Sequence, residues 1–217
     1  MTKPPFWAVI FDMDGVIADS EPTYLEAINV LLSSTGHQMS GEQYEQIIGS
    51  STEHTWRTIT ENFGLEGDMG DHIRRYNEVL MDLLRRPRET LPGVRQLLAE
   101  LRRLRVPAAL ATSSWKSWAE ALLQATGLDD AFDAVVWREM VEHAKPAPDL
   151  FLRAAELVKV EPARCIVLED TAPGLEAAKT AGMLAVQVRS ASTALLPQPH
   201  ADLVLDSLEH FPMELVG

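Results

Sequence analysis

Four acidic residues follow two short apolar runs of the chain: Asp12, Asp14, Glu169 and Asp170. Gly15 comes directly after Asp14, and a residue without a Cβ lets the backbone turn sharply and a ligand approach closely. Carboxylates gathered at one place repel one another and raise one another's pKa values unless a cation lies among them. Oxygen ligands of this kind favour Mg²⁺, which binds one or two carboxylates together with water and phosphate oxygens. These residues therefore predict a Mg²⁺ site.

A cation and several hydroxyl groups occupy comparable places in the sequence. Thr112 and Ser113 follow another apolar run and precede a helical pattern, so their hydroxyls and the N–H groups of the helix start can bind an anion. Lys145 lies in the segment Lys145-Pro146-Ala147-Pro148-Asp149, where the prolines restrict the loop that presents the ammonium group. Carboxylates, a divalent cation, a lysine and hydroxyls together indicate phosphoryl transfer.

The elements that must position these groups are short, continuously apolar runs, which are typical of strands buried on both faces of a parallel sheet. Helical patterns alternate with them, as at Leu97, Leu98, Leu101 and Leu104. We therefore predict an α/β fold with a doubly wound, Rossmann-like parallel sheet, whose ligand site lies at the carboxyl ends of the strands where the strand order reverses. The predicted strands are Trp7–Phe11, Ala108–Ala111, Ala134–Val136, Cys165–Leu168, Leu184–Val188 and Leu203–Leu205.

The stretch from about Ser20 to Arg88 interrupts this alternation, because it contains helical patterns and no convincing strand. Its glycines divide it into about four helices. We expect an α/β core formed by residues 1–18 and 89–217, with a helical domain of residues 19–88 inserted after the first strand.

Composition limits the possible partners. The chain has 217 residues, 46% of them hydrophobic, and its 32 acidic and 19 basic side chains give a net charge of −13. We expect neither nucleic acid nor a membrane as a partner, because no broad cationic surface is available. The single cysteine, Cys165, the lack of a charged and apolar leader at Met1–Pro5 and the lack of a long apolar run lead us to expect a cytoplasmic protein.

Four motifs, in this order, resemble those of the haloacid dehalogenase (HAD) superfamily. Each follows a predicted strand or opens a predicted helix, and the resemblance spans nearly the whole chain. The position of the helical insert is similar to that of the small four-helix cap in the β-phosphoglucomutase and phosphoglycolate phosphatase branch. The motifs are Asp12-Met13-Asp14-Gly15-Val16-Ile17 with Asp19-Ser20-Glu21, Ala111-Thr112-Ser113-Ser114, Lys145-Pro146-x-Pro148-Asp149 and Glu169-Asp170-Thr171-x-x-Gly174.

The resemblance implies a role for each motif residue. Asp12 is the expected nucleophile, which forms an aspartyl-phosphate, and Asp14 is the expected general acid and base. Thr112, Ser113 and Lys145 are expected to hold the phosphoryl oxygens. The ligands expected for Mg²⁺ are Asp12, the backbone carbonyl of Asp14, Glu169 and Asp170.

The cap is expected to close over the site and to select the leaving group. Two markers of the mutase branch are missing, because Tyr24 replaces its histidine and Thr52 replaces the arginine that follows the Gly-x-x segment, here Gly49-Ser50-Ser51. The resemblance thus favours hydrolysis of a small phosphomonoester such as a sugar phosphate. Candidate cap contacts to the substrate are Glu21, Thr52, Arg57, Arg74 and Arg75.

Two other interpretations stay open: a hexose phosphate mutase similar to β-phosphoglucomutase, and a catalytically silent HAD fold that serves as a binding module. Asp14 argues against a dehalogenase, which lacks the second aspartate, and the insert contains no lysine for phosphonate hydrolysis. The substrate could be a sugar phosphate, phosphoglycolate or a nucleotide. We expect a monomer, because the cap must move.

Overall fold

The computed structural model describes residues 6–47, 52–189 and 196–216. The chain divides into two compact units, which are considered one at a time below. The α/β unit comprises Met1–Asp19 and Pro87–Gly217, and the helical unit comprises Ser20–Arg86.

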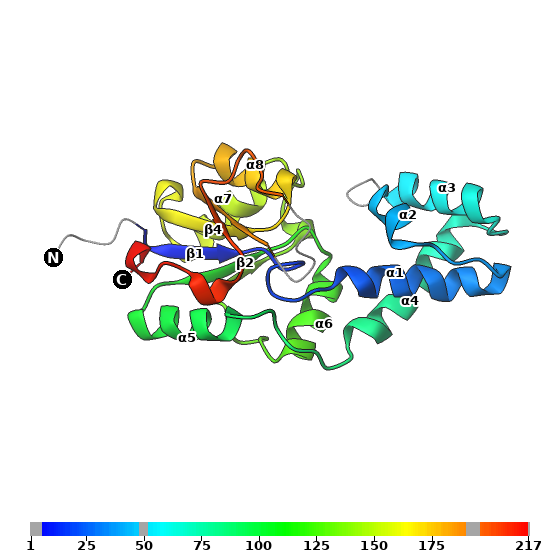
Figure 1. Cartoon of the computed structure of the whole chain (residues 1–217), viewed down its shortest axis with the longest axis horizontal. Coiled ribbons are helices and arrows are strands. Elements are labelled where there is room, and N and C mark those ends of the chain that lie inside the picture. The colour runs from blue at the N-terminus through cyan, green and yellow to red at the C-terminus, as the bar shows by residue number, and fades with distance from the viewer. Residues whose placement is uncertain (1–5, 48–51, 190–195, 217) are drawn as a thin grey trace. The chain divides into compact units, whose positions relative to one another are not determined.

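The α/β unit is built on a six-stranded, all-parallel sheet with the order β3-β2-β1-β4-β5-β6 (Figure 1). The order reverses around β1, which lies between β2 and β4. The predicted doubly wound topology is therefore confirmed, and the carboxyl ends of β1, β2 and β4 meet at one edge. The strands are β1 (Ala8–Phe11), β2 (Ala108–Ala111), β3 (Ala134–Val136), β4 (Cys165–Glu169), β5 (Leu184–Val188) and β6 (Leu203–Leu205).

Helices cover both faces of this sheet, with α7 and α8 on one side and α5 and α6 on the other (Figure 1). Helix α7 places Phe151 and Ala154 against Ile10 of β1 and Ala109 of β2, and all four side chains are fully buried. Small residues in β2 let the helix approach the sheet closely. The helices are α5 (Val94–Leu104), α6 (Lys116–Thr126), α7 (Asp149–Val158) and α8 (Ala172–Thr180), and the 3₁₀ turns of this unit are Arg138–Met140, Pro162–Arg164, Leu208–His210 and Met213–Leu215.

The expected start of the first strand at Trp7 is wrong by one residue. Strand β1 begins at Ala8, and the Trp7 side chain is 44% exposed. Its ring lies 5.1 Å from the guanidinium carbon of Arg164, a cation–π arrangement at the rim of the sheet. An apolar run alone does not distinguish a ring that stacks at the surface from one that packs in the core.

The helical unit contains α1 (Glu21–Leu32), a 3₁₀ turn (Ser33–Thr35), α2 (Gly41–Glu45), α3 (Thr52–Phe63) and α4 (Met69–Leu84). Helices α1 and α4 pack against each other, and Leu31, Trp56 and Ile59 belong to a core of the unit's own. Asp68 begins α4 by accepting hydrogen bonds from the N–H groups of Gly70 and Asp71. This unit therefore has a hydrophobic interior of its own, and the start of α4 is capped by a side chain.

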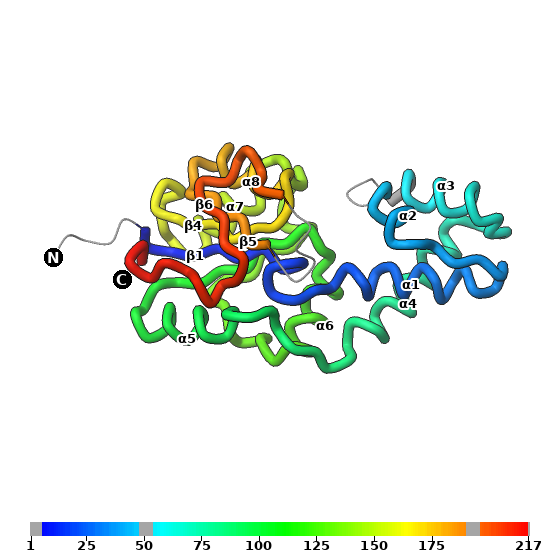
Figure 2. Tube along the Cα trace, viewed as in Figure 1, coloured from blue at the N-terminus to red at the C-terminus, as the bar shows by residue number. Residues whose placement is uncertain are grey.

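The last described segment of the chain returns to the start of β1, as the red and dark blue parts of the trace show (Figure 2). There the N–H of Phe6 donates to the carbonyl of Leu215 at 3.1 Å. Within the described ranges, no helix combines the length and the apolar character needed to cross a membrane.

A prediction follows from Gly93, which precedes α5 with a φ of +86°. A Cβ at this position would lie 2.2 Å from the backbone nitrogen of Glu209. Gly182 has a similar φ of +76° but open space around it. Replacing either glycine by alanine adds backbone strain of about 1–3 kcal/mol, and Gly93→Ala adds a clash worth about a further 1–3 kcal/mol. Urea unfolding should show a clearly larger loss in the free energy of unfolding for Gly93→Ala than for Gly182→Ala. Equal losses would contradict the close approach of Gly93 to the backbone of Glu209.

Candidate active site

Asp12 lies directly beyond β1, and its N–H donates to the carbonyl of Leu168 in β4 at 2.9 Å. The residue is 5% exposed. The backbone then folds back on itself, since the N–H of Ile17 donates to the carbonyl of Met13 at 2.8 Å. Parallel pairing of β1 with β4 thus places the first carboxylate beside Glu169, the last residue of β4.

Lys145 is the electrostatic centre of this edge. Its Nζ donates to Oδ1 of Asp12 and, at 2.7 Å, to Oε1 of Glu169. The ammonium group also lies 4.8 Å from the centroid of the buried Phe151 ring. The side chains of Lys145, Asp12 and Glu169 are 8%, 7% and 1% exposed, so these charges interact with little solvent between them.

Glu169 is held from its other side by the loop that follows β4. Its Oε2 accepts hydrogen bonds from the N–H of Thr171 at 2.6 Å and from the Thr171 hydroxyl at 2.9 Å. The same hydroxyl accepts from the N–H of Gly174 and so caps α8. A Cβ on Gly174 would lie 1.8 Å from Oε1 of Glu169, so only glycine leaves room for this carboxylate.

Asp12, Glu169 and Asp170 each offer a carboxylate oxygen within 4.8 Å of the others, which is a grouping that could hold a metal ion. Oδ1 of Asp170 is buried and has no hydrogen-bond partner among the described residues. A Cβ on Gly15 would lie 2.0 Å from the other Asp170 oxygen. An all-oxygen donor set with one unsatisfied buried oxygen fits a hard cation such as Mg²⁺.

The same crowding perturbs the acids in the absence of a cation. Burial, together with the nearby charges of Glu169 and Asp14, raises the pKa of Asp12 to about 7, although Lys145 opposes the shift. Burial and the charges of Glu169 and Asp12 raise the pKa of Asp170 to about 9. Burial alone would lower the pKa of Lys145, but the two facing carboxylates raise it above its ordinary value. The site therefore has more negative charge than one lysine balances.

The two predicted phosphate-binding hydroxyls differ in their surroundings. Thr112 is fully buried, and its Oγ1 accepts from the N–H of Ser114 at 3.0 Å. Ser113 is exposed. Asp14 is half-buried, and its Oδ2 accepts from the Ser114 hydroxyl at 2.8 Å. The Asp14 side chain is therefore directed to the loop after β2, and its expected metal contact through the backbone carbonyl stays a prediction.

The loop that carries Lys145 is closed by Asp149, the first residue of α7. Oδ2 of Asp149 accepts from the N–H of His143 at 3.2 Å and lies 3.1 Å from Nδ1 of the same residue. These bonds hold the pKa of Asp149 below its usual value. A carboxylate thus ties the two ends of the lysine loop together.

The five candidate cap residues all belong to the helical unit. Glu21 is half-buried in α1, Arg57 is exposed on α3, and Arg74 pairs with Asp71 on α4. Thr52 begins α3, and its side chain lies outside the described part of the chain, as does the segment Gly49-Ser50-Ser51. Their contacts to a substrate stay predictions.

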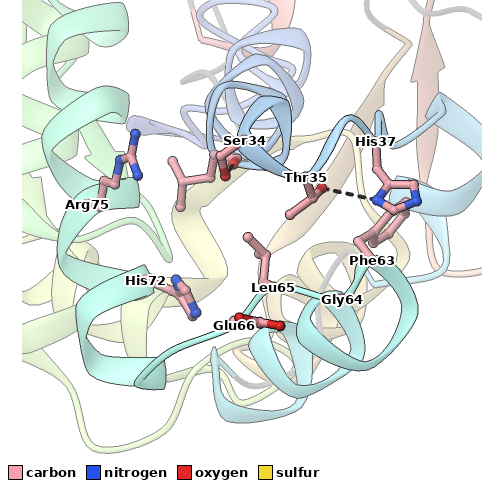
Figure 3. A pocket seen from close by; sticks show the side chains of 10 residues that line it. Ser34, Thr35, His37, Phe63, Gly64, Leu65, Glu66, His72 and Arg75 are labelled. Carbon is pink, nitrogen blue, oxygen red and sulfur yellow. Dashed lines mark hydrogen bonds between the residues drawn. The ribbon is translucent and has the colours of Figure 1, made fainter.

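Arg75 lines a pocket of about 450 Å³ within the helical unit, together with His37 and His72 (Figure 3). Two hydroxyls on its wall are already engaged, because Ser34 donates to the carbonyl of Leu31 and Thr35 to that of Leu32. Figure 3 also shows the bond between His37 and Thr35, 3.1 Å long. This pocket is lined by α1, α3 and α4 and the turns that join them.

Three residues of the site were not singled out from the sequence for the contacts that they make: Ser114, Thr171 and Asp149. Thr171 has a recognisable signal, because a threonine followed by a proline in the first turn is typical of a helix N-cap. Asp149 at the first position of a helix gives a similar indication. No such signal in the sequence distinguishes Ser114 from its neighbour Ser113.

Comparison with known proteins agrees with this geometry. Residues 9–188 match the model of the haloacid dehalogenase-like hydrolase family. The chain is 40% identical over 184 residues to "Fructose-1-phosphate phosphatase YqaB" of Escherichia coli. The match covers 83% of this chain and 95% of the relative. It is 32% identical over 216 residues to "Beta-phosphoglucomutase" of Bacillus subtilis. This match covers 96% of this chain and 93% of the relative.

The fold also matches solved structures. CbbY from Rhodobacter sphaeroides, crystallised in complex with phosphate, superposes with a TM-score of 0.82 at 27% identity and covers 95% of this chain and 96% of its own. The family match and the similarity of the fold thus show that the chain belongs to the haloacid dehalogenase-like hydrolases.

Proposed function

We propose that this chain is a Mg²⁺-dependent phosphatase that hydrolyses a small phosphomonoester through an aspartyl-phosphate on Asp12. The observation that carries the proposal is the buried cluster in which Lys145 bridges Asp12 and Glu169 beside Asp170. A carboxylate next to a fixed ammonium group and a cation-binding cluster suits attack on a phosphoryl group, whose negative charge would otherwise repel it.

In the proposed first half-reaction, a carboxylate oxygen of Asp12 forms a bond to phosphorus while the bond from phosphorus to the leaving oxygen breaks. The Asp14 carboxyl gives its proton to that oxygen, so an alcohol departs. In the second half-reaction, water attacks the phosphorus of the aspartyl-phosphate and gives a proton to the Asp14 carboxylate. The bond from Asp12 to phosphorus breaks, which releases phosphate and restores both acids.

The other residues of the α/β unit bind charge. Lys145, whose ammonium group donates to Asp12, is proposed to hold a phosphoryl oxygen, and the hydroxyls of Thr112 and Ser113 are proposed to hold the remaining oxygens. Asp12, Glu169, Asp170 and the carbonyl of Asp14 would hold Mg²⁺, which would offset the charge of the phosphoryl group and of the acids around it. Glu21, Thr52, Arg57, Arg74 and Arg75 of the helical unit are the proposed contacts to the leaving group.

A sugar phosphate is the proposed substrate class. The 40% identity to a fructose-1-phosphate phosphatase over most of both chains supports it, as does a second relative from Thermotoga maritima, named "Phosphorylated carbohydrates phosphatase", at 32% identity. The β-phosphoglucomutase of Bacillus subtilis is also similar, yet the mutase histidine is replaced here by Tyr24, whose side chain is 8% exposed. Hydrolysis is therefore favoured over phosphoryl transfer between sugar positions.

The first test is hydrolysis of p-nitrophenyl phosphate with and without Mg²⁺. We expect Mg²⁺-dependent turnover by the wild type and a loss of about 10³-fold or more in kcat for Asp12→Asn, because the amide is not a nucleophile. Absence of turnover in the wild type would refute the enzyme and leave a binding module as the explanation, whereas turnover unchanged in Asp12→Asn would refute Asp12 as the nucleophile.

The substrate class is tested in the same assay with a panel of phosphate esters. We expect the highest kcat/KM among hexose and pentose phosphates, with phosphoglycolate and nucleoside monophosphates as comparisons. Accumulation of an isomeric sugar phosphate instead of inorganic phosphate would favour the mutase.

Protons and Mg²⁺ are expected to compete for the same carboxylates. Because the pKa of Asp170 is raised to about 9 and that of Asp12 to about 7, both carboxyls bind protons near neutral pH when no cation is present. Mg²⁺ binding needs the ionised forms, so it should release protons, and affinity should rise about tenfold per pH unit between pH 7 and 9. Isothermal titration in buffers of different ionisation enthalpy measures both quantities. Asp170→Asn should remove the part of the proton release that comes from Asp170, which predominates above about pH 8, and an affinity that is flat over this range contradicts the prediction.

Gly174 in α8 allows a test of the position of Glu169. Alanine normally favours a helix over glycine by about 1 kcal/mol, but a Cβ here would lie 1.8 Å from Oε1 of Glu169 and displace it from Lys145. We expect Gly174→Ala to lower kcat/KM or Mg²⁺ affinity about 10- to 100-fold, while the protein stays folded. Gly41→Ala in α2, where a Cβ meets open space, is the matched control and should behave as wild type. Full activity in Gly174→Ala would show that the position of Glu169 is unimportant.

A further inference from the structure

Ser114 is fixed at three points in the loop between β2 and α6. Its N–H donates to Oγ1 of Thr112 at 3.0 Å, and its carbonyl accepts from the N–H of Arg138 at 3.1 Å. Its hydroxyl donates to Oδ2 of Asp14 at 2.8 Å. The residue is 8% exposed, so it is part of the interior of the loop.

These bonds join three separate loops. Asp14 follows β1, Thr112 and Ser114 follow β2, and Arg138 follows β3, so Ser114 connects the Asp14 side chain to the loops after β2 and β3. The adjacent hydroxyl of Ser113 is exposed. Two serines that are neighbours in sequence therefore have different environments, and Ser114 is the one bonded to Asp14.

We infer that Ser114 is a positioning residue that orients the Asp14 carboxyl for proton transfer to the leaving group. The inference rests on the proposed function, in which that proton moves to the leaving oxygen as the bond from phosphorus to this oxygen breaks and Asp12 becomes phosphorylated. Proton transfer needs hydrogen-bond geometry at the moment of bond cleavage, so a carboxyl free to rotate is a poorer acid. The Ser114 hydroxyl restrains that rotation and stays hydrogen-bonded to Asp14 after the proton has left.

The basicity of the leaving group determines how much this proton matters. The leaving group of an alkyl phosphate is a strongly basic alkoxide, which needs the proton. The leaving group of p-nitrophenyl phosphate, p-nitrophenolate, is a weak base and leaves without it. The value of kcat/KM reports the steps through phosphorylation of Asp12 and release of the alcohol or phenol. Loss of the Ser114 hydroxyl should therefore affect the two substrates unequally.

The test compares kcat/KM of wild type, Ser114→Ala, Ser114→Thr and the control Ser117→Ala, an exposed position on α6. The substrates are fructose 1-phosphate, glycerol phosphate and p-nitrophenyl phosphate. We expect Ser114→Ala to lower kcat/KM about 10- to 100-fold for the alkyl esters, but less than about threefold for p-nitrophenyl phosphate. Inhibition of Ser114→Ala by inorganic phosphate should stay unchanged. Ser114→Thr should recover most of the kcat/KM that Ser114→Ala loses, and Ser117→Ala should match the wild type.

Four results would count against these proposals, in different ways. Equal losses for alkyl and aryl esters, with weaker inhibition by phosphate, would overturn the inference and make Ser114 a phosphate-binding residue. Equal losses with unchanged inhibition by phosphate, or no loss for any of the three esters in Ser114→Ala, would overturn it as well, while an active wild type leaves the phosphatase proposal intact. A wild type that hydrolyses none of the three esters would refute the proposed function itself. Where thermal melting shows Ser114→Ala to be unfolded, Ser114→Cys, which keeps the volume but donates weakly, replaces it.

Discussion

The candidate active site depends on one buried ammonium group that lies between two buried carboxylates. Lys145, Asp12 and Glu169 come from the loop before α7, the end of β1 and the end of β4, and each is almost inaccessible to solvent. Removing water from three charges is unfavourable, and leaving one of them unpaired in the interior typically costs about 3–5 kcal/mol. Each of these side chains is therefore required by the other two, and the parallel order of β1 and β4 is what lets them meet.

Close approach of backbone to carboxylate is the second requirement. Gly15 and Gly174 stand where any Cβ would collide with Asp170 or Glu169, so the two acids lie against bare backbone on both sides of the cluster. Thr171 then holds Glu169 through its N–H and its hydroxyl while capping α8. The start of the helix and the orientation of the acid are thus determined by the same residue.

The net charge of −13 suggests at first that this protein would repel phosphorylated ligands. Several of those acids form the cluster itself, where the raised pKa values of Asp12 and Asp170 mark a local excess of negative charge. A bound divalent cation would remove that excess and favour a small phosphate group. Overall charge therefore argues against large polyanions and says little about a phosphomonoester.

The sequence is enough to predict the alternation of strands and helices, the six strand positions to within a residue, and the residue types that meet at the sheet edge. These features are local, because burial on both faces makes a run of apolar residues and because the polar residues follow directly after it. Tertiary structure alone decided that Trp7 lies at the surface, that Lys145 bridges Asp12 and Glu169, and that Ser114 rather than Ser113 contacts Asp14. Each of these depends on the direction of one side chain relative to a segment far away in the chain, and packing between elements sets that direction.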